Sequence, residues 1–246
     1  MDIRLDIVFI PPKGVANYSI NLCAQIEKQE QISFSLDGVN NFPHITIYQL
    51  VVPENNLERL IENLDQVTKN LNPQTFIVHS QNHKRQFVDE ADSGSSRTSR
   101  RLEQEEITGV SPWSFIFSDF QEHFGFLGAS FKNTEKIKKV QKEIVEQTTE
   151  LREGRNIQEA NDPTVASWPE NHKKIIAEYG FDNLFDFYNP HITITQLPDF
   201  EKAKQLAENL TWPFTKFVSN SIGLYELGEF GTCNKLIKEF KLKVAD

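Results

Sequence analysis

Two histidines lie in two nearly identical stretches of the chain. Residues 43–50 read Pro-His-Ile-Thr-Ile-Tyr-Gln-Leu and residues 190–197 read Pro-His-Ile-Thr-Ile-Thr-Gln-Leu, so the two octapeptides differ at one position only. They start 147 residues apart (190 minus 43), in a chain that contains six histidines. Histidine titrates near neutral pH, so one histidine can accept a proton while another donates one. The repeat therefore predicts two halves of the chain that each supply one histidine to a shared acid–base site.

The threonine two residues after each histidine extends this chemistry to a phosphate. In-line displacement at a phosphodiester or cyclic phosphate needs a base for the nucleophile and an acid for the leaving oxygen on the opposite side. A threonine hydroxyl can donate a hydrogen bond to a non-bridging phosphate oxygen. An ordinary strand needs only apolar periodicity, which does not explain why His and Thr recur at the same offsets. We therefore interpret both copies as functional.

The order of residues in each copy predicts a strand with two different faces. Side chains at positions i, i+2 and i+4 of a strand share a face. The predicted cleft-facing residues are His44, Thr46, Tyr48, His191, Thr193 and Thr195. Ile45, Ile47 and Gln49 are expected on the opposite face of the first strand, where the isoleucines anchor it in a core. The one difference between the copies, Tyr48 against Thr195, then falls on the cleft side and marks both residues as candidates for substrate contact.

The paired Pro-His-Ile-Thr-Ile motifs resemble the two-histidine (2H) phosphoesterase superfamily, which includes bacterial 2′-5′ RNA ligase-like proteins and cyclic phosphodiesterases. The resemblance implies a bilobal, pseudo-symmetric α+β fold, in which two antiparallel sheets line a central cleft, helices lie outside, and each motif is on an inner strand. It implies reactions at 2′,3′-cyclic or 2′-5′-linked phosphates without a metal or another cofactor. Carried onto this chain, it makes His44 and His191 the acid–base pair and Thr46 and Thr193 the phosphate ligands.

Composition limits the partners that can be expected. The 246 residues are 38% hydrophobic and 25% charged, with no apolar run long enough for a bilayer and a charged, alternating start. We predict one bilobal catalytic domain over residues 1–246, cytoplasmic and monomeric, with no membrane partner and with free thiols at Cys23 and Cys233. The net charge of -9 argues against a broad basic face that coats nucleic acid, but it allows a nucleotide or a single RNA end.

Hydrophobic periodicity places the motifs within alternating strands and helices. The expected strands cover residues 2–10, 31–37, 43–52, 75–78, 113–117 and 124–131, and the expected helices cover residues 16–29, 54–71, 133–152, 169–179 and 200–210. Residues 216–244 are predicted to form a hairpin that turns near 228–231, and 89–109 have the composition of a flexible insertion. Tyr225 in the hairpin is a candidate for stacking on a base, with core packing as the alternative.

Four functions stay open on these residues. Hydrolysis of a 2′,3′-cyclic or 2′-5′-linked phosphate is the first. The same histidines can run the reverse step and join RNA ends through a 2′-5′ bond, because microscopic reversibility exchanges their roles. The alternatives from other classes are a module that binds a nucleotide or RNA end without turnover, and an interaction protein in which both motifs are only structural strands.

Overall fold

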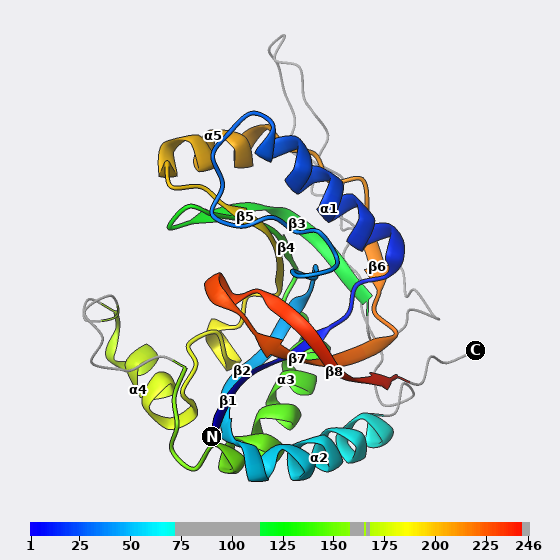
Figure 1. Ribbon diagram of the computed structural model, residues 1–246, viewed down its shortest axis with the longest axis vertical. Helices are drawn as coiled ribbons and strands as arrows, with labels where there is room; N and C mark the ends of the chain where they lie inside the picture. The colour runs from blue at the N-terminus through cyan, green and yellow to red at the C-terminus, as the bar shows by residue number, and fades with distance from the viewer. Residues whose placement is uncertain (72–113, 158–164, 166–167, 243–246) are drawn as a thin grey trace, which may run out of the picture.

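Two four-stranded antiparallel sheets form the framework of the part of the chain that the computed structural model describes, which comprises residues 1–71, 114–157, 165 and 168–242 (Figure 1). The first sheet has the order β2-β1-β7-β8 and consists of β1 (Asp2–Phe9), β2 (Ile45–Pro53), β7 (Ser221–Leu227) and β8 (Cys233–Lys241). The second has the order β5-β4-β3-β6 and consists of β3 (Ser114–His123), β4 (Phe126–Phe131), β5 (His191–Gln196) and β6 (Lys216–Val218).

The helices cover the outer faces of the two sheets. They are α1 (Lys13–Glu27), α2 (Leu57–Asn70), α3 (Glu135–Thr148), α4 (Glu170–Tyr179) and α5 (Phe200–Asn209), with short 3-10 turns at Glu54–Asn56, Thr149–Arg152, Phe185–Phe187 and Glu229–Gly231. Figure 1 shows α2 and α3 outside the first sheet and α1 and α5 outside the second. The predicted α+β class, with two antiparallel sheets and helices outside, is confirmed.

The chain repeats one order of elements in the two halves. Strand, helix, motif strand and helix follow one another as β1-α1-β2-α2 and again as β4-α3-β5-α5, with α4 inserted before β5. In each half, the helix that precedes the motif strand packs on the sheet of the other half. Helix α1 contacts β5 of the second sheet, and α3 contacts β2 of the first. Buried apolar residues from both lobes consequently belong to one continuous core.

Amphipathic sequence explains why these helices lie flat on the sheets. The buried apolar residues Leu60, Leu64 and Val67 of α2 recur every three or four positions and form one stripe. The same spacing recurs in α3 at Ile137, Val140 and Ile144. The side chain of Thr134 accepts a hydrogen bond from the Ile137 N–H and caps α3.

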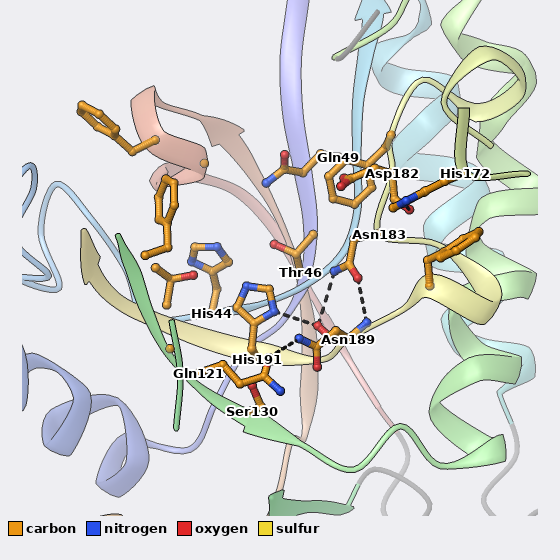
Figure 2. Close-up of a pocket in the computed structure, with 17 residues that line it drawn as sticks. His44, Thr46, Gln49, Gln121, Ser130, His172, Asp182, Asn183, Asn189 and His191 are labelled. Carbon is orange, nitrogen blue, oxygen red and sulfur yellow. Dashed lines mark hydrogen bonds between the residues drawn. The ribbon is translucent and has the colours of Figure 1, made fainter. Parts of the chain in front are cut away.

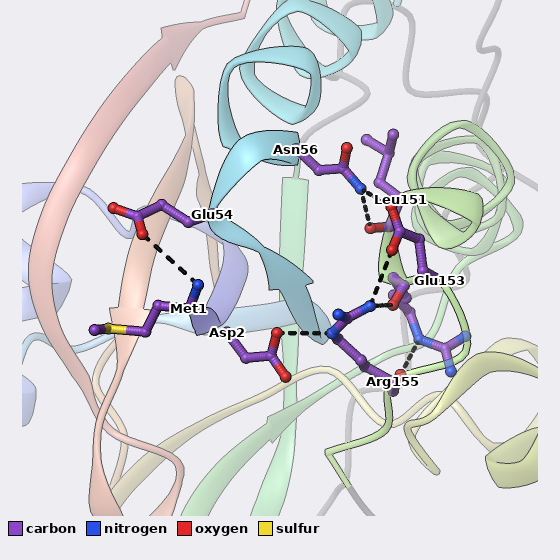
Figure 3. A network of polar contacts seen from close by, with 8 residues as sticks. Met1, Asp2, Glu54, Asn56, Leu151, Glu153 and Arg155 are labelled. Carbon is purple, nitrogen blue, oxygen red and sulfur yellow. Dashed lines mark hydrogen bonds and ion pairs between the residues drawn. The ribbon is translucent and has the colours of Figure 1, made fainter.

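Polar contacts join the start of β1, the start of α2 and the turn after α3 (Figure 3). The Arg155 guanidinium lies 2.7 Å from the Asp2 carboxylate and 3.2 Å from the Glu153 carboxylate. Asn56, just before α2, donates to the Leu151 carbonyl at 2.9 Å. These contacts hold the first strand, the start of α2 and the turn after α3 together at the edge of the molecule, away from the motifs.

Three predicted elements differ from the structure. Residues 31–37 form no strand, and the neighbouring Phe42 makes only an isolated bridge to Cys233. Within residues 216–244, the predicted hairpin with its turn near 228–231 is confirmed for β7 and β8, whereas the first part, β6, joins the second sheet instead. Each motif lies on an edge strand of its sheet, although β2 and β5 contact each other at the centre of the molecule. The predicted strand 75–78 and insertion 89–109 lie outside the described residues.

Within the described ranges, no helix is both long enough and apolar enough to cross a membrane.

Candidate active site

The two motifs meet in one pocket. A cavity of about 590 Å³ is lined by His44 and Thr46 from the first copy and by His191 and Thr193 from the second (Figure 2). This volume lies within the range of small-molecule sites. The four residues that the repeat singled out therefore share a site, as the shared-site hypothesis requires.

Both histidines are held by the same local hydrogen bond. Nδ1 of His44 lies 2.7 Å from the carbonyl oxygen of Phe42, and Nδ1 of His191 lies 2.7 Å from that of Asn189. A carbonyl oxygen can only accept, so Nδ1 carries the proton in each neutral ring. Nε2 is then the atom that can accept a proton as a base, or donate one once the ring is protonated.

A buried carboxyl group lies beneath the first motif. Asp6 on β1 is 0% exposed, and its Oδ2 accepts hydrogen bonds from Thr46 Oγ1 at 2.9 Å and Gln49 Nε2 at 3.1 Å. Nε2 of His44 lies 3.6 Å from the same oxygen, which is too long for a good hydrogen bond. Cys233 Sγ lies 3.8 Å from it. The motif alone did not reveal Asp6, because polar residues that alternate in a strand usually face solvent.

Burial opposes charge on both members of the Asp6–His44 pair. It raises the pKa of Asp6 from 3.8 to about 8, against the effect of hydrogen bonds from Gln49, Thr46 and Cys233. It lowers the pKa of His44 from 6.5 to about 4, and the nearby His191 lowers it further, while contacts with the main chain of Phe42 and Gly231 act the other way. The pair is therefore neutral at pH 7, and the 3.6 Å contact does not make an ion pair.

The second motif has different neighbours. Gly128 lies opposite Thr193, and a Cβ there would come within 3.3 Å of the Ile192 carbonyl and 3.5 Å of His191 Cδ2. The missing side chain lets the His191 ring lie close over β4. Ser130 pairs with His191 across the strands, lines the pocket, and has a buried Oγ without a hydrogen-bond partner.

The first motif strand carries a β-bulge that changes which side chains reach the pocket. Neighbouring residues of β1 pair with Thr46 and Tyr48, which leaves Ile47 as the extra residue. Gln49 consequently lines the pocket, whereas Tyr48 is fully buried and donates to the Tyr179 carbonyl at 2.7 Å. The expectation that Tyr48 faces the cleft and Gln49 the core is wrong, because strict alternation does not continue through a bulge.

The second motif strand has a bulge at the corresponding residue. Ile194 is left over between Thr193 and Thr195, which pair with consecutive residues of β4. Thr195 is buried and its hydroxyl donates to the Phe34 carbonyl at 2.7 Å. The position at which the copies differ is thus structural in both halves, and Thr195 does not line the pocket.

The structure places Tyr225 outside the pocket as well. This residue packs beside Phe42, with ring centroids 5.6 Å apart, in a small cluster with Val8 and Cys233. Its side chain is almost wholly buried. The stacking prediction is wrong for this tyrosine, and core packing is the reading that the structure supports.

The segment before β5 forms one wall of the pocket, which the sequence pattern did not indicate. His172 is stacked between Trp168 and Phe187, at centroid distances of 4.6 and 4.0 Å, and both His172 and Phe187 line the pocket. Asn183 accepts from the Asn189 N–H at 2.7 Å and so supports the loop that ends in the second motif (Figure 2). Amide and aromatic residues in a loop carry no periodic signal that would have indicated this role.

Comparison with known proteins gives a match to solved structures. No protein-family model matches the chain, and no curated protein sequence matches it. The structure resembles E. coli LigT. A crystal structure of LigT complexed with NADP+ is 12% identical, covers 98% of this chain and 99% of LigT, and has a TM-score of 0.46. For LigT in the apo form the identity is 10%, the coverage 99% of both chains, and the TM-score 0.47. The likeness to LigT thus extends over the whole chain but is modest.

Proposed function

We propose that this chain is a phosphoesterase of the two-histidine type, which hydrolyses 2′,3′-cyclic phosphates or 2′-5′-linked nucleotides or RNA ends. The observation that carries the proposal is that two histidines, each with Nδ1 bonded to the carbonyl two residues earlier, line one pocket with a threonine beside each. This arrangement supplies an acid, a base and two hydroxyl groups around one phosphate.

The neutral state of His44 makes it the base in the proposed reaction. Its lowered pKa leaves Nε2 unprotonated at pH 7. Nε2 takes a proton from water as the water oxygen attacks phosphorus. The bond from phosphorus to the leaving ribose oxygen breaks, and protonated Nε2 of His191 gives that oxygen its proton. A cyclic phosphate then yields a phosphomonoester and a free hydroxyl. The step leaves His44 protonated and His191 neutral, and proton exchange with solvent returns both rings to their starting states.

The threonines act on the charge that develops at the phosphate. Hydroxyl donors aimed at the non-bridging oxygens stabilise the transition state more than the ground state. Thr193 makes no side-chain hydrogen bond to another described residue, so its proton is available to a phosphate. Thr46 Oγ1 lies 2.9 Å from Asp6 Oδ2, so it acts in the same way only when its proton is not given to that oxygen.

A substrate panel tests this proposal. We expect turnover of at least one of 2′,3′-cyclic nucleotides, 2′-5′ oligoadenylates, cyclic dinucleotides and RNA with a cyclic phosphate end. Activity should persist in the presence of a chelator, and it should fall below about pH 4, where His44 takes up a proton. Binding without turnover of every substrate would contradict the proposal and favour a sensor. Loss of activity in the presence of the chelator would indicate that the reaction needs a metal ion.

A further inference from the structure

The carboxyl group of Asp6 occupies an unusual place for an acidic residue. It is fully buried on β1, where it pairs with Gln49 on one side and Tyr225 on the other. Its Oδ2 lies within hydrogen-bond distance of Thr46 and Gln49, and its Oδ1 is buried without a hydrogen-bond partner among the described residues. Among the described residues no lysine or arginine pairs with it. A carboxylate in this position would be a buried, uncompensated charge, which is strongly unfavourable.

The groups around Asp6 do not supply the missing positive charge. The titratable side chains that face or approach it are His44 before β2, Cys233 on β8, Tyr188 before β5 and its cross-strand neighbour Tyr225. Burial and the proximity of Asp6 raise the pKa of Cys233 well above its usual range, and burial raises the pKa of Tyr225 to about 12. Both therefore stay protonated and neutral, and His44 is neutral at pH 7.

The protonation state of Asp6 decides where the Thr46 hydroxyl points its hydrogen. A hydroxyl has one proton to donate. If Asp6 is a carboxylate, Thr46 must give that proton to Oδ2, 2.9 Å away, and presents only lone pairs to an incoming phosphate oxygen. If Asp6 is a carboxylic acid, the hydrogen bond at the same distance can run from Oδ2 to Thr46 Oγ1. The threonine proton is then free for the phosphate.

We propose that Asp6 is a positioning residue of the reaction: as a neutral carboxylic acid, it donates to Thr46 Oγ1 and thereby directs the Thr46 hydroxyl hydrogen at the substrate phosphate. This inference rests on the proposed phosphoesterase function and adds a residue that the repeated motif does not contain. The second half of the molecule does without the device, because Phe126 occupies the corresponding register position, opposite Gln196 as Asp6 is opposite Gln49.

Asp6→Asn separates this role from a purely structural one. An asparagine amide can donate to Thr46 at every pH, and Gln49 can turn its own amide to accept the second amide hydrogen. We expect this variant to keep kcat/KM at pH 7 within about threefold of the wild type, whereas Asp6→Val should lose about 10- to 100-fold. Above pH 8 the wild type should lose up to about tenfold per pH unit, and Asp6→Asn should lack that part of the decline.

The two motif threonines provide matched controls. Thr46→Val should abolish the same part of the alkaline decline, because ionisation of Asp6 no longer affects a hydroxyl. Thr193→Val should retain it. A decline caused by the general acid His191 would persist in Asp6→Asn, so only the difference between that variant and the wild type bears on Asp6. Thermal unfolding of each variant at pH 7 shows whether it is folded.

Two results would overturn the inference. A loss of tenfold or more in folded Asp6→Asn at pH 7 would mean that a carboxylate is required, and identical pH profiles for wild type and Asp6→Asn would leave Asp6 with a structural role only. If no substrate turned over, the phosphoesterase proposal alone would fail. The same pH comparison would then be made on the Kd for 2′,3′-cyclic AMP, where wild-type affinity should weaken above pH 8 and Asp6→Asn affinity should not.

Discussion

The two motifs have the same sequence around His and Thr, but different side chains of the neighbouring strands lie beneath them. Both carry a bulge at the second isoleucine and hold their histidine by a bond to the carbonyl two residues earlier. The motifs differ in the residue that the neighbouring strand supplies: β1 places Asp6 beneath the first motif, and β4 places Phe126 at the equivalent register position. Residues within a motif thus fix the orientation of its functional groups, whereas the adjacent strand decides which side chain lies beneath them.

Because their surroundings differ, His44 and His191 have different roles in the proposed reaction. His44 is 9% exposed, and its burial together with the nearby His191 keeps it neutral at pH 7 by lowering its pKa. His191 lies over Gly128 and beside Ser130 and is less buried, and in the proposed reaction it is the general acid. Identical substitutions in the two halves test whether the two histidines have different roles.

The largest effect is expected at the histidines. His44→Asn and His191→Asn should each lower kcat by about 10³-fold or more, because each removes one proton-transfer group from the transition state. Their acid–base roles predict different pH profiles: His44→Asn should lose the decline at low pH and His191→Asn the decline that its own ionisation causes at high pH. Steady-state kinetics over the pH range measures this. Loss of the same limb in both variants would refute the assignment of base and acid.

The threonines should give the next largest effect. Thr46→Val and Thr193→Val are each expected to lower kcat about 100-fold at pH 7, since each removes one donor to the phosphate. Thr46→Val also removes a hydrogen-bond partner of the buried Asp6 and should cost about 1 kcal/mol of stability, whereas Thr193→Val should change the unfolding temperature little. Thr46→Ser and Thr193→Ser keep the hydroxyl and serve as controls. A large effect in one half only, measured under the same conditions, would show that a single threonine contacts the phosphate.

The buried acid should also appear in the pH dependence of stability. Asp6 has a pKa of 3.8 when exposed and about 8 in the folded protein, so its contribution is complete below about pH 4 and is lost as the pH rises to about 8. His44 acts in the opposite sense, with a contribution that is present above its usual pKa of 6.5 and lost as the pH falls to about 4. The two slopes oppose each other below pH 6.5, and the Asp6 slope alone remains above it.

Wild-type stability should accordingly fall between about pH 6.5 and 8, by at most about 1.4 kcal/mol per pH unit from this group. Asp6→Asn should remove that slope, which denaturant unfolding at the two pH values can measure. An unchanged slope in the variant would show that Asp6 titrates in its ordinary range.

The smallest effects are expected where the copies differ in sequence. Tyr48→Phe and Thr195→Val each remove one buried hydrogen bond, to the Tyr179 and Phe34 carbonyls respectively, and should cost about 1 kcal/mol of stability while leaving kcat/KM nearly unchanged. Gln49→Leu, which alters a residue that does line the pocket, is the contrasting variant. A tenfold loss of activity in Tyr48→Phe would contradict the placement of this tyrosine.

Periodicity and the repeat were sufficient to predict an α+β fold and the meeting of His44, Thr46, His191 and Thr193 in one pocket, whereas the two antiparallel sheets followed from the resemblance of the paired motifs to a known superfamily. They failed where a local irregularity or a distant pairing decides the outcome. A bulge at Ile47 reverses the faces of Tyr48 and Gln49, and no residue type in the motif marks it. Asp6 reads as the polar member of an alternating strand until the pairing of β1 with β2 places it beneath Thr46. Residues 31–37 have strand composition but find no partner in either sheet.

The central claim is that His44 and His191 act on one phosphate in one step, and the double variant tests it most directly. Groups that act as a unit show strongly non-additive losses. The double variant His44→Asn/His191→Asn is measured on the best substrate of the panel at pH 7. Its activity should equal, within about threefold, that of the less active single variant. A double variant whose loss equals the product of the two single losses would mean that the histidines act independently, and would contradict the shared site.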